Sequence, residues 1–418
     1  MKVWLRTFGC RANQYDTEAV RALIERGGHS VATTVTDADI AVFNSCAVTS
    51  DAVADLRQAI RRAARDNPRI ESVVMGCASA LAEGEALRAL PKVSAIVGGA
   101  DLGAVARALG IDSPVDDART QGQSGTRGLL RIQDGCDEHC TFCATTMARG
   151  ANRSRLIEAL IAEATVLADR HAEIVITGIH IGTYGVDVGT SLGVLVARLV
   201  ESVPHVRFRL TSVEATEVDD RLLELMQAFP RRIVPNIHAP LQSGSDAVLK
   251  RMGRHWYSAA TYRRAVERMA DRLPVFGLGA DIITGFPGET DADHEATLSL
   301  VETLPFTYLH VFPYSARPGT AATRLSNSVS PVVARRRARE LRAVGEAKTF
   351  AYSEQRAGQV ADVVVLGGGA SRRGLTEDYL EVVLDDQGLG RGERVDVVLE
   401  MREGKLCGVV PALAAGLM

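Results

Sequence analysis

The 418-residue chain has no run of apolar residues long enough to cross a membrane and no segment that resembles a signal peptide. A membrane helix needs roughly 18 consecutive apolar residues, and the first residues, Met1 to Arg6, become charged too early for a leader. The net charge of −3 excludes attraction of nucleic acid by the chain as a whole, so any basic surface must be local. We therefore predict a cytoplasmic protein without a membrane partner.

Cysteine is also scarce, and its seven copies cannot all form disulfides because their number is odd. Disulfides are rare in cytoplasmic proteins, where clustered cysteines are more often metal ligands or catalytic groups. We interpret the last cysteine, which stands alone in its segment, as structural, and the other six as two sets of three. In chain order the seven are Cys10, Cys46, Cys77, Cys136, Cys140, Cys143 and Cys407.

The pattern of apolar runs divides the chain into three blocks and one polar segment, which together predict an α/β protein. Residues 1–112 alternate Val/Ile runs with helical stretches, which predicts a parallel α/β domain. The Gly- and Ser-rich residues 113–128 are predicted to be a linker. Residues 129–350 contain six strand–helix units, which predicts an incomplete form of the eight-unit barrel. Residues 351–418 are predicted to form a small antiparallel β-barrel.

Short runs of Val, Ile, Leu and aromatic residues give the predicted strands. They cover 40–44, 73–76 and 95–98 in the first block, 129–134, 173–179, 206–211, 235–241, 275–283 and 306–313 in the second, and 359–366, 379–384, 393–400 and 405–410 in the third.

The central cysteines, Cys136, Cys140 and Cys143, directly follow the first predicted strand of the second block. Structural zinc usually takes four ligands, commonly in separated Cys-x-x-Cys pairs. No fourth cysteine follows nearby, and His139 adjoins Cys140, which makes joint ligation awkward. Three thiolates are typical of a four-iron cluster that keeps one iron open. We therefore predict a redox-active cluster here, with structural zinc as the alternative.

The N-terminal cysteines, Cys10, Cys46 and Cys77, are far apart in the sequence, yet each ends a predicted strand segment, 5–10, 40–46 or 73–77. In a parallel sheet the carboxyl ends of all strands lie on one edge, where ligands bind. Three cysteines at that edge can converge on a second cluster, again with a vacant iron. The alternative is that they are buried structural residues, since free cysteine is among the most buried residue types.

The spacing Cys-x3-Cys-x2-Cys after the first barrel strand resembles the radical S-adenosylmethionine superfamily. Segments 211–214 (TSVE), 240–245 (PLQSGS) and 281–289 (DIITGFPGE) also match it at the ends of predicted strands, although singly such pairs as Gly-Ser are ordinary turn residues. The resemblance implies that the open iron binds S-adenosylmethionine, which one electron cleaves to a 5′-deoxyadenosyl radical. On this basis we assign cofactor contacts to Asn13, Gly178, Ser212, Glu214, Gln242 and Asp281.

The two cysteine triplets together resemble the methylthiotransferases over nearly the whole chain. Segments 7–18 (TFGCRANQYDTE), 310–315 (HVFPYS) and 317–320 (RPGT) are similar to the branch that modifies N6-threonylcarbamoyladenosine in tRNA. The resemblance implies two [4Fe–4S] clusters, the N-terminal one holding the sulfur, with S-adenosylmethionine serving as methyl donor and as radical source. It also implies a sulfur donor, an electron donor such as a flavodoxin or ferredoxin, and a TRAM-like RNA-binding barrel at 351–418.

Two positions depart from the family pattern. After Cys143 and Ala144 the chain has Thr145, Thr146 and Met147, where the family usually ends in Pro and Tyr before Ala-Arg-Gly. Ala215 stands where the family has Pro. Both departures leave the cysteines intact and concern the shape of the loop beside the cofactor.

A predicted basic helix at 331–350 is one candidate for binding RNA. It carries Arg335, Arg336 and Arg339 within a local excess of positive charge. Such a run is also typical of a solvated helix face, but beside a small β-barrel contact with phosphates is favoured.

Further candidates for RNA contact lie near the central cluster and in the last block. Arg149, Arg153 and Arg155 follow the cluster loop and could hold an anionic anticodon stem near the open iron. Tyr379 could stack on a base, or alternatively belong to the core of the small barrel.

The sequence therefore predicts a tRNA methylthiotransferase that adds a methylthio group to carbon 2 of N6-threonylcarbamoyladenosine at position 37, beside the anticodon. The cofactors carry the chemistry, so no side chain is assigned as a catalyst. Arg11, between Cys10 and Asn13, is the candidate partner of the threonylcarbamoyl carboxylate, unless it is simply exposed beside the site. The rivals are the same chemistry on isopentenyladenosine or on a ribosomal-protein side chain, and a non-catalytic iron–sulfur RNA-binding protein.

Overall fold

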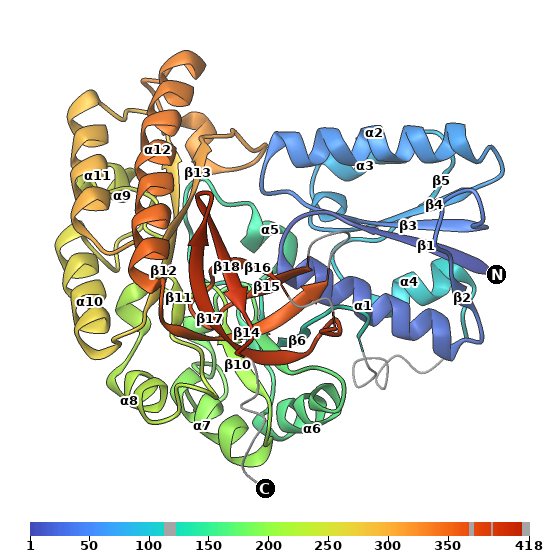
Figure 1. Ribbon diagram of the computed structural model, residues 1–418. Helices are drawn as coiled ribbons and strands as arrows, with labels where there is room; N and C mark the ends of the chain where they lie inside the picture. Colours follow the sequence, from blue (N-terminus) through green and yellow to red (C-terminus); the bar gives the residue numbers. More distant parts are fainter. Residues whose placement is uncertain (113–122, 368–371, 386–387, 412–418) are drawn as a thin grey trace, which may run out of the picture.

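The N-terminal part of the chain is a five-stranded parallel sheet with helices on both faces (Figure 1). The computed structural model describes residues 1–112, 123–367, 372–385 and 388–411. The strand order is β2-β1-β3-β4-β5. The elements are β1 (Lys2–Thr7), α1 (Arg11–Arg26), β2 (Ser30–Val31), β3 (Ile40–Ser45), α2 (Ser50–Asp66), β4 (Glu71–Gly76), η1 (Ala78–Ala80), α3 (Glu83–Arg88), β5 (Val93–Ile96) and α4 (Leu102–Leu109).

Strand alternation sends neighbouring residues of this sheet into two separate cores. Val42 packs with Leu23 of α1 on one face, whereas Phe43 packs with Leu56 of α2 on the other. Because both faces are covered, the strands are apolar throughout, as is usual for parallel sheets.

The central part contains six parallel strands in two three-stranded sheets, ordered β6-β9-β10 and β11-β12-β13. Isolated bridges from Phe208 to Ile233 and from Ser212 to His238 connect them, so the strands run as one open barrel wall. The strands are β6 (Gly128–Arg131), β9 (Glu173–Thr177), β10 (Arg207–Leu210), β11 (Asn236–His238), β12 (Gly277–Thr284) and β13 (Tyr308–Pro313), with the short pair β7 (Gln133–Asp134) and β8 (Arg153–Ser154) beside them.

Helices follow these strands and lie along the outside of the wall (Figure 1). The α-helices are α5 (Thr145–Arg149), α6 (Ile157–Ala168), α7 (Leu192–Ser202), α8 (Asp220–Ala228), α9 (Asp246–Arg251), α10 (Ala259–Arg272), α11 (Asp291–Thr303) and α12 (Pro331–Arg356), and the 3-10 helices are η3 (Ile181–Thr183), η4 (Ala215–Glu217) and η5 (Ala321–Arg324).

The alternation along β10 separates an apolar outer face from a charged inner one. Phe208 and Leu210 join the large core beneath the helices. Arg207 and Arg209 point the other way and are almost completely buried, at 0% and 1% exposure. Buried arginines must be paired, and their partners come from the C-terminal part of the chain.

The C-terminal part is a closed five-stranded barrel with the strand order β14-β15-β16-β18-β17. All its pairs are antiparallel except β16 with β18, which is parallel. The strands are β14 (Val360–Gly367), β15 (Arg372–Leu375), β16 (Glu381–Leu384), β17 (Arg394–Arg402) and β18 (Lys405–Val409).

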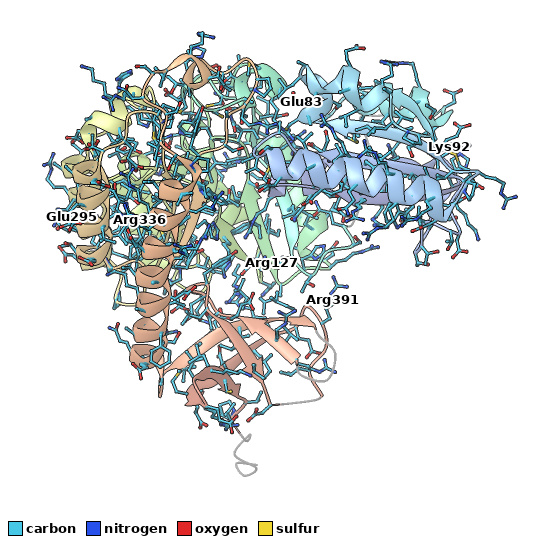
Figure 2. All side chains as sticks on the ribbon, turned by 90° about the horizontal axis from the view of Figure 1, so that it is seen from above. Glu83, Lys92, Arg127, Glu295, Arg336 and Arg391 are labelled. Atoms are coloured by element: carbon cyan, nitrogen blue, oxygen red, sulfur yellow. The ribbon has the colours of Figure 1, made fainter. Side chains whose placement is uncertain are left out.

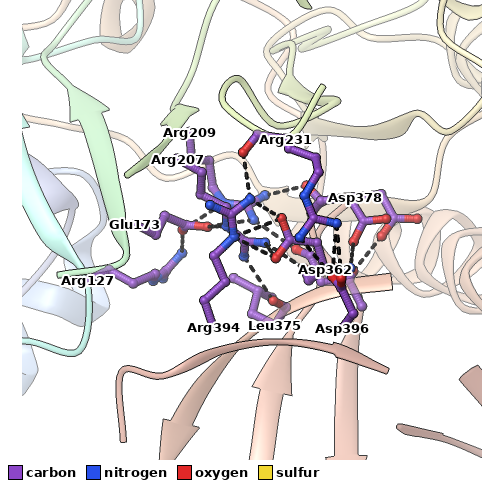
Figure 3. Close-up of polar contacts among 12 residues, drawn as sticks. Arg127, Glu173, Arg207, Arg209, Arg231, Asp362, Leu375, Asp378, Arg394 and Asp396 are labelled. Carbon is purple, nitrogen blue, oxygen red and sulfur yellow. Dashed lines mark hydrogen bonds and ion pairs between the residues drawn. The ribbon is translucent and has the colours of Figure 1, made fainter. Parts of the chain in front are cut away.

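A buried ion network joins this barrel to the central part (Figure 3). Glu173 of β9 is fully buried and accepts hydrogen bonds from Nε of Arg207 at 2.7 Å and Nε of Arg209 at 2.9 Å. Arg207 also donates to the backbone oxygen of Asp362 at 2.5 Å, and Arg209 donates to the backbone oxygen of Thr376 at 2.8 Å. The two arginines therefore bind the core carboxylate and the barrel backbone at once.

The predicted fold class is confirmed: a parallel α/β part, a six-stranded open barrel and a closed small β-barrel follow one another along the chain. Strands β2, β8 and β15 were not predicted. The basic helix, predicted to end at 350, continues to Arg356 because neither Gly nor Pro stands between Phe350 and Gly358. Most of the predicted linker, 113–122, lies outside the described residues. Within the described residues, no helix is long and apolar enough to span a bilayer.

Candidate functional site

The three N-terminal cysteines lie at one edge of the parallel sheet. Cys10 follows β1 and directly precedes α1, Cys46 follows β3, and Cys77 follows β4. These strands are neighbours and run in the same direction, so their carboxyl ends meet. The structure thus brings together residues that are far apart in the sequence.

Asn13, in the first turn of α1, is fully buried among these cysteines. Its side-chain amide donates to the backbone oxygens of Phe8 and Ser45 at 2.9 and 2.8 Å. Because both N–H groups are used there, the amide oxygen faces the thiols, 3.9 Å from Sγ of Cys10 and 3.8 Å from Sγ of Cys77. Asn13 therefore ties the loops that carry the sulfurs to one another.

Gly9 lets the first of these loops pass close to the second. Its φ is +90°, and a Cβ there would lie 2.6 Å from both Cβ and Sγ of Cys46. Alanine would meet the steric clash as well as the strain of positive φ. The glycine before Cys10 is therefore required by the convergence of the cysteines.

We expect Gly9→Ala to lower the iron content after anaerobic reconstitution from about eight per chain towards about four, by loss of the N-terminal cluster. Gly28→Ala is the matched control, because Gly28 also has positive φ (+74°) but nothing within 4 Å of its Cβ position. Iron assay and absorbance of both variants measure the effect. Equal iron in Gly9→Ala and wild type would contradict the close packing of Cys10 against Cys46.

The central cysteines lie in the loop between β7 and α5. The loop is closed by backbone hydrogen bonds, from the N–H of Cys136 to the oxygen of Gly150 at 3.0 Å and from the N–H of Cys143 to the oxygen of Cys140 at 3.1 Å. The three side chains are thereby held on one short turn.

Charged side chains contact the sulfurs of this loop. Nη1 of Arg254 donates to Sγ of Cys140 at 3.5 Å, and Nδ1 of His180 lies 3.7 Å from Sγ of Cys136. Arg254 is buried and also pairs with Glu214. Donors of this kind stabilise anionic sulfur and set the potential of iron–sulfur clusters.

Burial controls the protonation of the metal-free thiols. It raises the pKa of Cys77 to about 11, against the opposing effect of Arg149, and the pKa of Cys140 to about 12, against that of Arg254. The pKa of Cys46 is also raised by burial. These thiols are protonated at neutral pH, so binding of a metal centre must release their protons.

The spacing of the sulfurs fits a cluster better than one zinc ion. Sulfurs around a single zinc lie roughly 3.8 Å apart, since each Zn–S bond is about 2.3 Å. Among the described residues, the one group of three or more possible ligands that all lie within 4.8 Å of one another is His238, Asp281 and His310. In each cysteine triplet at least one pair of sulfurs is therefore more than 4.8 Å apart.

The residues predicted to contact S-adenosylmethionine occupy several places at the strand ends. Gly178 and Ser212 line a cavity, and Gln242 is buried with a φ of +61°. Glu214 pairs with Arg254 through one oxygen, while its buried Oε2 has no hydrogen-bond partner among the described residues. That free acceptor beside the cluster loop fits the amino group of such a cofactor.

A cavity of about 540 Å³ opens between the three parts of the protein. Cys10 and Cys46 line it from the N-terminal sheet, Thr211 and Asp281 from the central strands, and Tyr379 from the small barrel. Its volume is within the roughly 300–1,000 Å³ of ligand sites. Cys10, Cys46 and the strand ends of the central part thus face the same space.

Arg11 and Tyr379 meet across this cavity. Nη2 of Arg11 donates to the hydroxyl of Tyr379 at 2.9 Å, and the Tyr379 ring is 5.0 Å from that of Tyr308. The guanidinium of Arg209 lies over the same ring at 5.3 Å. Tyr379 has a φ of +73°, a strained value that its neighbours on three sides maintain. Tyr379 is therefore a wall of the cavity rather than a core residue of the small barrel.

Four ring-bearing residues of the cavity were not predicted: His238, Tyr308, His310 and Phe312. Asp281 accepts from Nε2 of His238 at 3.1 Å and from Nδ1 of His310 at 3.2 Å. Although burial raises it, these hydrogen bonds hold the pKa of Asp281 well below its usual range. Period-two spacing in β13 places Tyr308, His310 and Phe312 on one face, and this signal was available in the sequence.

The arginines after the cluster loop differ in exposure. Arg149 has a side chain only 3% exposed, and its guanidinium nitrogens are bonded to protein atoms, so it does not face an RNA phosphate. Arg155 pairs with Glu163 at 2.6 Å and is 21% exposed. Arg153 is 59% exposed; it pairs with Asp134 at 3.8 Å and donates to the backbone oxygens of Arg149 and Ala151 at 3.0 and 3.1 Å.

The three arginines of α12 predicted to bind RNA, Arg335, Arg336 and Arg339, lie on the exposed side of the helix. Arg335 and Arg339 are exposed, whereas Arg336 donates to Asp291 and Glu340 at 3.4 and 3.0 Å. Figure 2 shows Arg336 on the side of the molecule away from Lys92 of the N-terminal sheet. Arg339 is 17 residues before Arg356, where α12 meets the small barrel, or about 26 Å along the helix. Only the C-terminal end of α12 therefore lies beside the small barrel, as predicted, whereas Arg339 lies away from it.

Two family models match the chain. Residues 2–98 match the Uncharacterized protein family UPF0004, and residues 130–301 match the Radical SAM superfamily. The first covers the N-terminal cysteines and the second the central ones.

Several relatives are similar over most of the chain. The threonylcarbamoyladenosine tRNA methylthiotransferase MtaB of Thermotoga maritima is 36% identical over 359 residues, covering 78% of each protein. MtaB of Bacillus subtilis is 34% identical over 407 residues, covering 91% of this chain and 90% of that protein. The tRNA-2-methylthio-N(6)-dimethylallyladenosine synthase of a Jannaschia species is 34% identical over 367 residues, covering 82% of this chain and 79% of that protein.

Among solved structures, the radical S-adenosylmethionine methyltransferase TsrM of Kitasatospora setae is similar in fold. The TM-score is 0.53 at 14% identity, over 77% of this chain and 76% of that one. At that identity the similarity concerns the fold alone.

Proposed function

Because the chain belongs to the radical S-adenosylmethionine tRNA methylthiotransferases, we propose that it adds a methylthio group to carbon 2 of N6-threonylcarbamoyladenosine, next to the anticodon of tRNA. One observation carries the proposal: Cys10 and Cys46 line the same cavity as the strands of the radical domain. A sulfur held at the N-terminal site and a base held in the cavity are thus neighbours.

The cofactors of the family are [4Fe–4S] clusters and S-adenosylmethionine, and both cysteine triplets offer thiolates of the required kind. When bound, these groups supply the electron, the radical chemistry and the methylthio sulfur. We assign Cys10, Cys46 and Cys77 to one cluster and Cys136, Cys140 and Cys143 to the other.

The chain's own residues then bind and orient the cofactors and keep water out of the site. Arg254 holds the charge of Cys140, and the free oxygen of Glu214 is placed for a cofactor amino group. Gly178, Ser212, Gln242 and Asp281 remain our candidates for the other cofactor contacts, and Asn13 acts on the N-terminal thiols instead.

Arg11 supports the proposal that the substrate carries a threonylcarbamoyl group. Within the described part of the chain its guanidinium has one hydrogen bond, to Tyr379, so most of its N–H groups are available at the cavity wall. Threonylcarbamoyl carries a carboxylate, for which a guanidinium is a bidentate partner, whereas isopentenyl is apolar. Tyr379 and Tyr308 bring aromatic rings to the cavity lining, and aromatic rings are a common contact surface for bases.

We expect the reconstituted enzyme, given both tRNAs, to methylthiolate threonylcarbamoyladenosine and not isopentenyladenosine. Arg11→Ala should reduce kcat/KM for the former by about 10- to 100-fold, as for loss of one charge-assisted pair. Arg11→Lys should reduce it less, because the charge is kept. Nucleoside mass spectrometry after digestion measures each product.

Other outcomes would decide between the rivals. A 2-methylthio product on isopentenyladenosine alone would move the chain to the branch of the Jannaschia relative. Methylthiolation of a ribosomal protein without product on either tRNA would assign a protein substrate. No cleavage of S-adenosylmethionine after reduction would favour a non-catalytic iron–sulfur protein.

For the tRNA body we retain Arg153 and the exposed Arg335, Arg336 and Arg339 as phosphate contacts, with Arg155 partly exposed beside them. The proposed partners are tRNA, a sulfur donor and an electron donor such as a flavodoxin or ferredoxin.

A further inference from the structure

Arg149 lies at the end of α5, six residues after Cys143, yet its side chain contacts the N-terminal cysteine site. The side chain is 3% exposed and crosses from the central part of the protein to the N-terminal part. Arg149 connects the two cysteine sites: its backbone ends α5, the helix that follows the central cysteine loop, and its guanidinium binds the N-terminal site.

Three of its hydrogen bonds are directed at the N-terminal site. Nε donates to Sγ of Cys77 at 3.3 Å. Nη2 donates to Oδ1 of Asn13 and to Oδ2 of Asp16, both at 2.7 Å. On its other side, Nη1 donates to Asp134 at 3.1 Å, close to the start of the cluster loop.

Asn13 links the guanidinium of Arg149 to the N-terminal cysteine loops. Its amide N–H groups are used by Phe8 and Ser45, so its oxygen is fixed towards Arg149 and the thiols. The sulfurs of Cys10 and Cys77 lie within 4 Å of that oxygen. Arg149 therefore acts on one sulfur directly and on the loop of another through Asn13.

The charge of Arg149 is permanent. A guanidinium stays protonated in proteins, and this one pairs with the carboxylates of Asp16 and Asp134 at 2.7 and 3.1 Å. A fixed cation beside a sulfur ligand stabilises the more negative state of a cluster, as do N–H donors to its sulfurs.

We propose that Arg149 is a positioning residue that holds the N-terminal cluster against the radical-cluster loop and raises the reduction potential of that cluster through its N–H bond to Cys77. This inference rests on the proposed assignment of Cys77 as a cluster ligand. It replaces the predicted role of Arg149 in binding RNA.

An ion pair between the two parts of the protein is the simpler explanation, and Arg131 offers its matched control. Arg131 pairs with the same carboxylates, Asp16 and Asp134, and is also buried, but it contacts no sulfur among the described residues. A purely structural role predicts the same behaviour for Arg149→Gln and Arg131→Gln.

The test uses the full chain with Cys136, Cys140 and Cys143 replaced by Ala, so that a redox titration followed by electron paramagnetic resonance reports only the N-terminal cluster. We expect Arg149→Gln to shift its midpoint potential negative, Arg149→Lys to shift it less, and Arg131→Gln to leave it in place. Equal shifts for Arg149→Gln and Arg131→Gln, or none for either, would overturn the proposal.

In the enzyme with both clusters, we expect Arg149→Gln to lower methylthio product by at least about tenfold, the effect of one charge-assisted hydrogen bond, while cleavage of S-adenosylmethionine persists. Equal loss of cleavage and product would mean that the variant disrupts the central loop and would reject the proposed role. If the unmodified enzyme makes no product on any tRNA, the proposed function fails, and the potential shift still decides the role of Arg149.

Discussion

Cys77→Ala is expected to abolish methylthiolation of tRNA and to leave reductive cleavage of S-adenosylmethionine in place. Cys77 follows β4 at the carboxyl edge of the N-terminal sheet, beside Asn13 and Arg149. Cleavage depends instead on the loop that follows β7 in the central part. Removing one ligand of the first site therefore separates the two activities. Quantifying 5′-deoxyadenosine and the methylthio nucleoside in the same reaction measures both.

Two matched variants complete this experiment. Cys143→Ala should lose both activities, because the central cluster is then missing. Cys407→Ser should lose neither, since Cys407 lies in β18 of the small barrel, far in sequence from both triplets. If Cys77→Ala eliminated cleavage in a folded protein that still binds iron at the central site, the separate assignment of the triplets would be wrong.

Glu173→Gln is expected to destabilise the protein by about 3–5 kcal/mol, the usual cost of removing one partner from a buried ion pair. Glu173 is fully buried and binds Arg207, Arg209 and Arg127. Those arginines together hold its pKa well below its usual range against the effect of burial. Gln keeps the volume but removes the charge and directs an amide donor at the guanidinium groups. Urea denaturation followed by tryptophan fluorescence measures the change.

Asp396→Asn is the control for this second experiment. Asp396 pairs with Arg231 at 3.0 Å in the same view of the barrel junction (Figure 3), but both side chains are about half exposed. Exposed pairs contribute within about 1 kcal/mol. Similar losses of unfolding free energy in the two variants would show that the buried network does not fasten the barrel.

The sequence was sufficient to predict most of the strands and the convergence of the N-terminal cysteines, because both follow from local patterns. Val/Ile runs mark strands, and a residue after a parallel strand must lie at the carboxyl edge of the sheet. Cys10, Cys46 and Cys77 could therefore be grouped before any coordinates existed. Gly9 was a visible but unused signal, since glycine precedes Cys10, Cys77 and Cys136 alike.

The contacts between the three parts could not be predicted in the same way. Arg149 looks like a surface cation in sequence, and only its partners Asp16 and Asn13, more than 130 residues earlier, make it internal. Arg207 and Arg209 likewise stand in an ordinary alternating strand, where polar residues usually face water. Their burial depends on backbone oxygens of the small barrel, at residues that no periodicity links to β10.

Tyr379 gives the small barrel a structural role at the cavity. Its ring completes the wall of the cavity, with Arg209 of the central part on one side and Arg11 of the N-terminal part beside its hydroxyl. The three parts are consequently not interchangeable modules: a barrel transplanted from a relative would bring its own side chains into the wall of this cavity. Residues of all three parts together set its shape.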